Sequence, residues 1–251
     1  HWALLGGFTR CCLLVGSSLG PQILPNTKGE KHTIITSNTT QFCVRLFTFI
    51  EGRLWAKVHP KTSVLRHDLG YKAGAITKAL LDFTSSQSQS DSHWDLANAS
   101  WSDKHTALFK TEKRALIKKF QSLFKAVEPC HKTLPKSTIH ADVNDYNCIV
   151  SNNFKNPEIT GIIDFGDACY TQTINDVAIT IAYGVMNVPD PLDAAVEILK
   201  GYKKQYSFTE NELHCLFTLV AMRLITTLTK AALRKQENST NPYHSISEQP
   251  A

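Results

Sequence analysis

Two short apolar segments with acidic and amide residues at their ends constrain the fold of this chain most strongly. Residues 148–151 and 159–163 are rich in Ile and Val, and a polar turn separates them. This pattern predicts two antiparallel strands joined as a hairpin. Asn147 lies before the first strand and Asp164 lies after the second. Because these two strand ends meet at one end of a hairpin, we expect the two side chains to lie close together.

The side chains at this end of the hairpin have the chemistry of a phosphoryl-transfer site. The amide oxygen of Asn147 and the carboxylate of Asp164, in a set without Cys or a second His, suit a hard cation such as Mg²⁺ better than zinc. Asp142 precedes Asn147 on the loop that leads into the hairpin, where its carboxylate can accept a proton from a hydroxyl acceptor. We predict that His140 anchors this loop through hydrogen bonds to the backbone.

Outside the hairpin, the sequence predicts a few strands near the start and mainly helices after them. Residues 33–36 and 42–50 are predicted as strands. The period of apolar residues predicts helices over 62–83, 108–128 and 174–187, and capping residues at Asp190 and Thr209 begin two more. We expect the apolar residues of the second and last helices to face the core: Leu116, Phe120, Leu123, Phe124 and Val127, and Leu213, Leu216, Phe217, Val220, Leu224 and Leu228.

The composition is that of an ordinary globular protein, with 42% apolar and 20% charged residues. No run of 18 apolar residues is present, so we predict no membrane span and no membrane partner. The seven cysteines include no Cys-x-x-Cys pair, which favours a reduced, cytoplasmic location. The net charge of +5 permits an anionic ligand but identifies none, and we expect no nucleic-acid partner.

The motifs of the hairpin together resemble a known group of small-molecule kinases. His140-x-Asp142-x-x-x-x-Asn147, followed by Ile163-Asp164-Phe-Gly-Asp167, is similar to the aminoglycoside phosphotransferase and choline kinase branch of the protein-kinase-like fold. More specifically, the chain resembles the hydroxylysine kinase family. The segments that carry this resemblance are 144–147, 162–167, 177–181, Val44–Gly52 and His93–Leu96. The similarity covers residues 21–250.

The resemblance implies an α+β fold with two lobes. Residues 21–52 would be the remnant of an N-terminal β lobe and the strand that links it to the second lobe. Residues 53–251 would form a mostly helical catalytic lobe that carries the hairpin. Residues 1–20 fit neither lobe and are expected to be a leader or a partial helix.

The resemblance also implies a reaction. The γ-phosphate of GTP, or of ATP, would pass to the hydroxyl of 5-hydroxy-L-lysine, with Mg²⁺ as the cofactor. Asp142 would be the base, and Asn147 and Asp164 would hold the metal ion. The substrate would therefore be a small amino acid or amine together with a nucleoside triphosphate.

Further contacts follow from the same resemblance. The backbone around Phe47, Thr48 and Phe49 would contact the purine of the nucleotide. Asp145 or Asp167 would bind the cationic groups of the amino-acid substrate. These assignments rest on the family and not on the spacing of the residues.

The chain departs from the family pattern in ways that keep other readings open. Ala141 stands where the family has Gly, and the consequence depends on the backbone conformation there. No glycine-rich loop and no strand-borne Lys is recognisable upstream, and the chain is expected to be trimmed at both ends. A truncated pseudokinase that acts only by binding is therefore one alternative. A metal-dependent hydrolase with His140, Asp142 and Asp164 as ligands is another.

Overall fold

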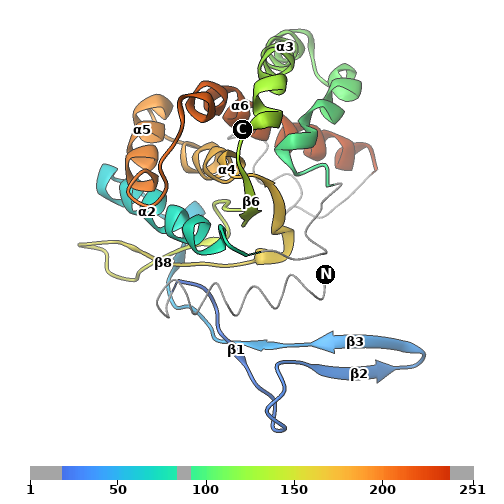
Figure 1. Ribbon diagram of the computed structural model, residues 1–251, viewed down its shortest axis with the longest axis vertical. Coiled ribbons are helices and arrows are strands. Elements are labelled where there is room, and N and C mark those ends of the chain that lie inside the picture. The colour runs from blue at the N-terminus through green and yellow to red at the C-terminus, as the bar shows by residue number, and fades with distance from the viewer. Residues whose placement is uncertain (1–18, 84–91, 238–251) are drawn as a thin grey trace.

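Helices make up most of the body of the molecule in the computed structural model, which describes residues 19–83 and 92–237 (Figure 1). The longer helices are α2 (Ser63–Leu80), the 3₁₀ helix η2 (Leu96–Leu108), α3 (Thr111–Thr133), α4 (Ile174–Gly184), α5 (Pro191–Tyr202) and α6 (Glu210–Gln236). Both predicted caps are present, because Asp190 accepts from the Asp193 amide and Thr209 forms a capping box with Glu212.

The predicted hairpin is confirmed as two strands of a small antiparallel sheet. The sheet contains β5 (Arg53–Leu54), β7 (Cys148–Val150) and β8 (Ile159–Ile162), with β7 in the middle. Cys148 lies opposite Ile162, and a bulge follows at Ile149 and Val150. This register places the residue before β7 and the residues after β8 at the same end of the hairpin.

A second pair of strands holds together the two ends of the segment that contains the hairpin. Strand β6 (Lys136–Ile139) pairs antiparallel with β9 (Cys169–Gln172), so that Ile139 lies opposite Cys169. The loop that begins at His140 leaves β6, and the short 3₁₀ turn Phe165–Asp167 leads into β9. The acidic residues at 142, 164 and 167 are therefore confined between two strand pairs.

The N-terminal strands form a thin arm that projects from the helical body (Figure 1). The arm contains β1 (Ile23–Leu24), β2 (Thr33–Ser37), β3 (Thr40–Val44) and β4 (Leu46–Phe47). The single strand predicted over 42–50 is wrong in extent, because β3 pairs with β2 whereas β4 pairs with β1. The chain changes partner at Arg45, which belongs to neither ladder.

Helix α4 is the centre of the core. All of its residues are buried, as its apolar sequence predicts. Helices α2 and α5 cross beside it at two glycines, where the backbones approach too closely for a side chain. A Cβ on Gly70 would lie 1.9 Å from the Ile198 carbonyl oxygen, and a Cβ on Gly201 would lie 1.9 Å from the His67 carbonyl oxygen.

Helix α3 differs from its prediction at both ends. It begins at Thr111 because the preceding residues form the 3₁₀ helix η2, and it continues through Pro129 to Thr133. Two of its residues that were predicted to face the core, Leu116 and Leu123, are exposed.

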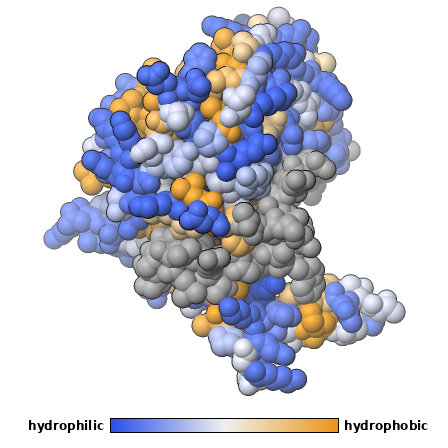
Figure 2. Space-filling model, in the orientation of Figure 1, coloured by the Kyte–Doolittle hydropathy of each residue, from blue (hydrophilic) through white to orange (hydrophobic). Residues whose placement is uncertain are grey.

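Helix α6 is long and apolar enough to cross a membrane by length and composition, but most of its apolar window is buried inside the protein. The prediction of its inward face is only partly right. Leu216 and Leu228 are buried, whereas Leu213 and Phe217 are exposed. The helix is rotated so that Arg223 enters the core, and the exposed leucine and phenylalanine instead line an apolar groove of about 800 Å³ between α3, α5 and α6. Figure 2 shows apolar residues gathered over this part of the surface.

Candidate active site

The loop between β6 and β7 is anchored by His140, which is fully buried. Its Nε2 lies 3.1 Å from the Ile163 carbonyl oxygen on the second half of the hairpin. Its Nδ1 accepts a hydrogen bond of 3.2 Å from the Asp142 amide. The imidazole ring also packs against Phe165. Both ring nitrogens are therefore used to tie the loop to the backbone around it.

Ala141 has a left-handed backbone conformation, with φ of 64°. This is the region that glycine adopts without strain and that a residue with a Cβ atom disfavours. A buried carboxylate holds the turn in place, because the Ala141 amide donates to Asp176 Oδ1 at 3.0 Å. The other oxygen of Asp176 accepts a hydrogen bond of 2.6 Å from Thr77 on α2. Burial raises the pKa of the Asp176 carboxyl.

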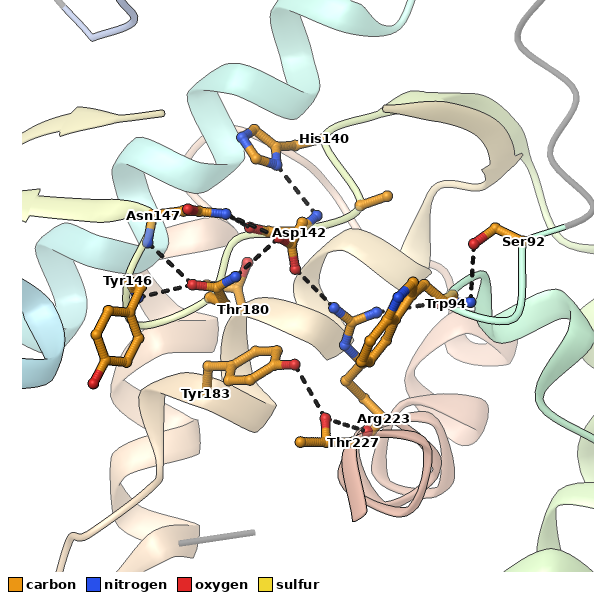
Figure 3. Close-up of polar contacts among 12 residues, drawn as sticks. Ser92, Trp94, His140, Asp142, Tyr146, Asn147, Thr180, Tyr183, Arg223 and Thr227 are labelled. Atoms are coloured by element: carbon orange, nitrogen blue, oxygen red, sulfur yellow. Dashed lines mark hydrogen bonds and ion pairs between the residues drawn. The ribbon is translucent and has the colours of Figure 1, made fainter. Parts of the chain in front are cut away.

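Asp142 is held by three side chains (Figure 3). Its Oδ1 forms an ion pair of 2.8 Å with Nη2 of Arg223. Its Oδ2 accepts hydrogen bonds of 2.9 Å from the side-chain amides of Asn144 and Asn147. Of the Asp142 side chain, 17% remains exposed, so the carboxylate can be reached from outside.

Asn147 and Asp164 lie side by side at the end of the hairpin, as the strand pairing predicts. The Ile163 amide donates to the Asn147 carbonyl oxygen at 2.9 Å, which brings the next residue, Asp164, beside Asn147. The Asn147 side-chain nitrogen is directed at Asp142, so its Oδ1 is the atom available to a cation. Asp164 is exposed, has φ of 63° and accepts a hydrogen bond from the Gly166 amide with Oδ1.

These oxygen atoms fit a hard cation such as Mg²⁺. Among the described residues, no group of three or more His, Cys, Asp or Glu side chains is placed to hold a metal ion. A hydrolase site with His140, Asp142 and Asp164 as three ligands would also need a free imidazole nitrogen, and both nitrogens of His140 are engaged.

A pocket of about 590 Å³ extends from Asp164 to residues 47–50, a linker that connects the N-terminal arm to the helical body. Phe47, Thr48 and Phe49 line it, as does the Asp164–Gly166 turn. Phe49 is 87% exposed and lies at the surface of the pocket. The Thr48 amide donates to the Gln22 carbonyl oxygen at 2.8 Å and so is already occupied. No Lys or Arg is found among the described residues that line this pocket.

The two acidic residues suggested for substrate binding have different surroundings. Burial raises the pKa of the Asp145 carboxyl to about 6, and Lys61 opposes this shift. The buried Oδ1 of Asp145 has no hydrogen-bond partner among the described residues. Asp167 is exposed, and its pKa is raised first by partial burial and then by the negative charge of Asp142. The negative charge of Asp142 contributes to the raised pKa of both carboxyls.

Arg223 is the site residue that the sequence reasoning missed. Only 2% of its side chain is exposed, although it carries a positive charge. The helical period of this helix predicts that its leucines face the core, and it gives no role to Arg223. A signal was present, because Arg223 is the only Asp, Glu, Lys or Arg between Glu212 and Lys230. A lone charge in such an apolar stretch is rarely buried without a partner.

Comparison with known proteins relates the chain to phosphotransferases. A model of the phosphotransferase enzyme family matches residues 21–211. Hydroxylysine kinase of Mus musculus is 28% identical over 207 residues, which cover 78% of this chain and 55% of that protein. The chain thus spans little more than half the length of this relative.

Two solved structures resemble the whole chain. A microcompartment-associated aminopropanol kinase has a TM-score of 0.71 at 15% identity, and the match covers 99% of this chain and 78% of that one. The amicoumacin kinase hAmiN, in complex with AMP-PNP, Ca²⁺ and Ami, has a TM-score of 0.69 at 14% identity, with 98% and 75% covered. At this identity the likeness concerns the fold, and it confirms the predicted α+β fold of the aminoglycoside phosphotransferase type.

Proposed function

Because the chain belongs to the phosphotransferase enzyme family, we propose that it transfers the γ-phosphate of a nucleoside triphosphate to a hydroxyl group of a small amino acid or amine. The observation that carries this proposal is the hydrogen bond between Asn147 Nδ2 and Asp142 Oδ2. It joins the candidate base to a candidate metal ligand at the end of the hairpin. We propose 5-hydroxy-L-lysine as the acceptor, since the mouse relative is named a hydroxylysine kinase. We propose GTP as the donor, since the resemblance to the hydroxylysine kinase family implies it and an aminoglycoside 2'-phosphotransferase-IIIa of similar fold has been solved as a GDP complex.

In this proposal Asp142 orients the acceptor hydroxyl and takes its proton. An ionised carboxylate has about four lone-pair sites, and the hydrogen bonds from Asn144, Asn147 and Arg223 fill three of those of Asp142. The remaining site is on Oδ1. The acceptor hydroxyl can donate to this site while its oxygen faces the terminal phosphate.

Asn147 Oδ1 and Asp164 Oδ2 would hold Mg²⁺ at the end of the hairpin. When bound, Mg²⁺ neutralises charge on the phosphates and thereby lowers the barrier to transfer. The backbone of Asn147 is fixed by the Ile163 amide, and Asp164 is fixed by the Gly166 amide, so both ligands start from defined positions. The purine would lie against the linker residues Phe47 to Phe49, which line the same pocket as Asp164.

We assign the cationic group of the acceptor to Asp167 in preference to Asp145. Asp167 is exposed beside Asp142, whereas an oxygen of Asp145 is buried next to Lys61. An exposed carboxylate near the base can bind an ammonium group without the cost of removing a buried charge from its partner.

A pseudokinase that binds nucleotide without turnover is the second candidate. One observation favours it, because no Lys or Arg among the described residues lines the nucleotide pocket. Within the described part of the chain, only the metal ion would then compensate the charge of phosphates in this pocket.

A panel of hydroxylated amino acids and amines, tested with GTP and with ATP in the presence of Mg²⁺, separates the two candidates. We expect formation of a phosphorylated 5-hydroxylysine, detected by mass spectrometry, with faster turnover from GTP. Nucleotide binding without a product from any acceptor would support the pseudokinase and reject the enzyme.

A further inference from the structure

Arg223 makes a set of contacts that go beyond filling the core. It comes from the middle of α6 and reaches Asp142 Oδ1 with Nη2 at 2.8 Å. Its Nη1 donates to the carbonyl oxygen of Trp94 at 3.0 Å. The guanidinium also lies over the rings of Trp94, at 4.8 Å, and Tyr183, at 5.3 Å. Two aromatic faces and two hydrogen bonds thus fix its plane.

Each support of Arg223 is itself held by the fold (Figure 3). The Trp94 amide donates to Ser92 Oγ at 3.1 Å. The next residue, Asp95, begins the 3₁₀ helix η2 and accepts a hydrogen bond of 2.9 Å from Thr171 on β9. The Tyr183 hydroxyl lies 3.1 Å from the hydroxyl of Thr227 on α6. The guanidinium therefore has little freedom to move.

We propose that Arg223, clamped by Trp94 and Tyr183, is the positioning residue that fixes the direction of the Asp142 carboxylate. This inference rests on the function proposed for Asp142. Asn144 and Asn147 occupy Oδ2, and Arg223 occupies one side of Oδ1, which leaves one defined lone pair for the acceptor hydroxyl. The mid-chain segment at residues 93–96, far from the hairpin in sequence, acts on the base through this clamp.

The geometry requires an arginine and not just a positive charge. A planar guanidinium can donate to Trp94 and Asp142 at the same time while it stacks on the two rings. A lysine ammonium is a point charge that cannot reproduce these four contacts together. A displacement of about 1 Å in a reacting group can cost about 100-fold in rate, so loss of the clamp should be visible in turnover.

The test compares Arg223→Met and Arg223→Lys with Lys230→Met in the chain as it exists. Lys230 is a matched control, because it lies on the same helix and over the same Trp94 ring. We expect kcat of Arg223→Met to fall about 100-fold with the KM for nucleotide nearly unchanged, because the clamp acts on the base and not on the nucleotide pocket. Arg223→Lys should also lose most of the kcat of the parent chain, whereas Lys230→Met should keep it.

A second readout does not depend on turnover. The side-chain amide signals of Asn147 in ¹⁵N–¹H spectra report its hydrogen bond to Asp142. They should shift and exchange faster with water in Arg223→Met, but not in Lys230→Met. If the parent chain has no activity, the proposed function fails and these spectra alone decide the clamp.

Unchanged kcat, or unchanged Asn147 signals, in a folded Arg223→Met protein would overturn the proposal. If Arg223→Met does not fold by circular dichroism, the decision passes to Arg223→Lys, which keeps the charge and most of the volume. A rate and spectrum like those of the parent chain in Arg223→Lys would then reject the need for the planar clamp.

Discussion

The backbone conformation of Ala141 sets the geometry of the loop that carries Asp142. Its positive φ turns the chain between β6 and Asp142, and its amide is fixed by Asp176. The left-handed conformation costs a residue with a Cβ about 1–2 kcal/mol. The carboxylate of Asp176 compensates by accepting the amide hydrogen bond inside the core.

Ala141→Gly should therefore stabilise the protein. Relief of the left-handed strain outweighs the greater flexibility of glycine in the unfolded chain, for a net gain of about 0.5–1 kcal/mol in the free energy of unfolding. Denaturation by urea measures this value. Ala75→Gly, in the right-handed helix α2, is the control and should lose about 1 kcal/mol. A loss of stability in Ala141→Gly would contradict the assigned conformation.

The buried carboxyl of Asp145 should make stability depend on pH. Its pKa of about 6 in the folded protein lies above its ordinary value of 3.8. The proton is therefore bound more tightly by the folded state, and this stabilising contribution is complete below pH 3.8 and is lost as the pH rises through 6.

Asp145→Asn removes this ionisation. The variant should match the parent chain near pH 4 and exceed its stability by about 2 kcal/mol at pH 8. Urea denaturation at a series of pH values gives the difference directly. A difference that stays constant with pH, or that favours the parent chain at pH 8, would show that the carboxyl is not buried as described.

At the scale of single residues, the sequence predicts the positions of the hairpin residues but not the residue that holds Asp142 from outside the loop. The residues of the loop and hairpin follow from strand pairing, because Asn147 and Asp164 must meet whenever the two strands pair. Arg223 could not be assigned in the same way. It contacts Asp142 across 81 positions of sequence, and nothing local to either residue encodes that contact.

Among the elements, the crossing of α2 and α5 supports the catalytic loop from behind. Thr77 on α2 donates to Asp176, whose other oxygen holds Ala141. The two helices can approach this closely because Gly70 and Gly201 have no side chains. Packing of two helices and the geometry of a distant loop are thus linked through one buried carboxylate.

Gly201→Ala should test this link. Its new Cβ would lie 1.9 Å from the His67 carbonyl oxygen, so α2 and α5 must separate. We expect a loss of about 3 kcal/mol or more in the free energy of unfolding, at the upper end of overpacking effects. Gly74→Ala, on α2, is the matched variant.

At Gly74 the nearest atom to a new Cβ is the Tyr202 carbonyl oxygen at 3.0 Å, which small movements can relieve. The higher helix propensity of alanine, about 1 kcal/mol, should offset the remaining strain. Thermal melting measures both variants. Equal stability of the two would mean that the helices do not cross at Gly201.

The existence of the elements was easier to predict than the direction of their faces. The apolar period of α6 predicts a helix, but leucines extend around more than half of its surface. Burial of Glu212 and Arg223, which bond to Tyr206 and Asp142, selects the inward face instead. The buried face therefore combines apolar residues such as Leu219 and Met222 with two charged residues that have polar partners.

In the whole molecule, the candidate site lies where three separate parts of the chain meet. The hairpin supplies Asn147 and Asp164, residues 47–49 supply one wall of the pocket proposed for the nucleotide, and α6 supplies Arg223. The hairpin pair follows from strand pairing, whereas the role of residues 47–49 was implied by the family resemblance alone and stays a prediction. The chain matches little more than half of the mouse relative, and its pocket lacks basic side chains among the described residues. Transfer of phosphate to a hydroxyl acceptor therefore tests this arrangement as a whole.

Phosphate transfer by the parent chain and by Asp142→Asn tests the central claim most directly. With GTP, Mg²⁺ and 5-hydroxylysine, the parent chain should form phosphorylated hydroxylysine, and the variant should be slower by about 10³-fold because it lacks a base. Nucleotide binding should persist, since Asp142 does not line the nucleotide pocket. Asp103→Asn, which removes a surface ion pair with Lys125, should keep the parent rate. Equal rates for the parent chain and Asp142→Asn would contradict the assignment of the base.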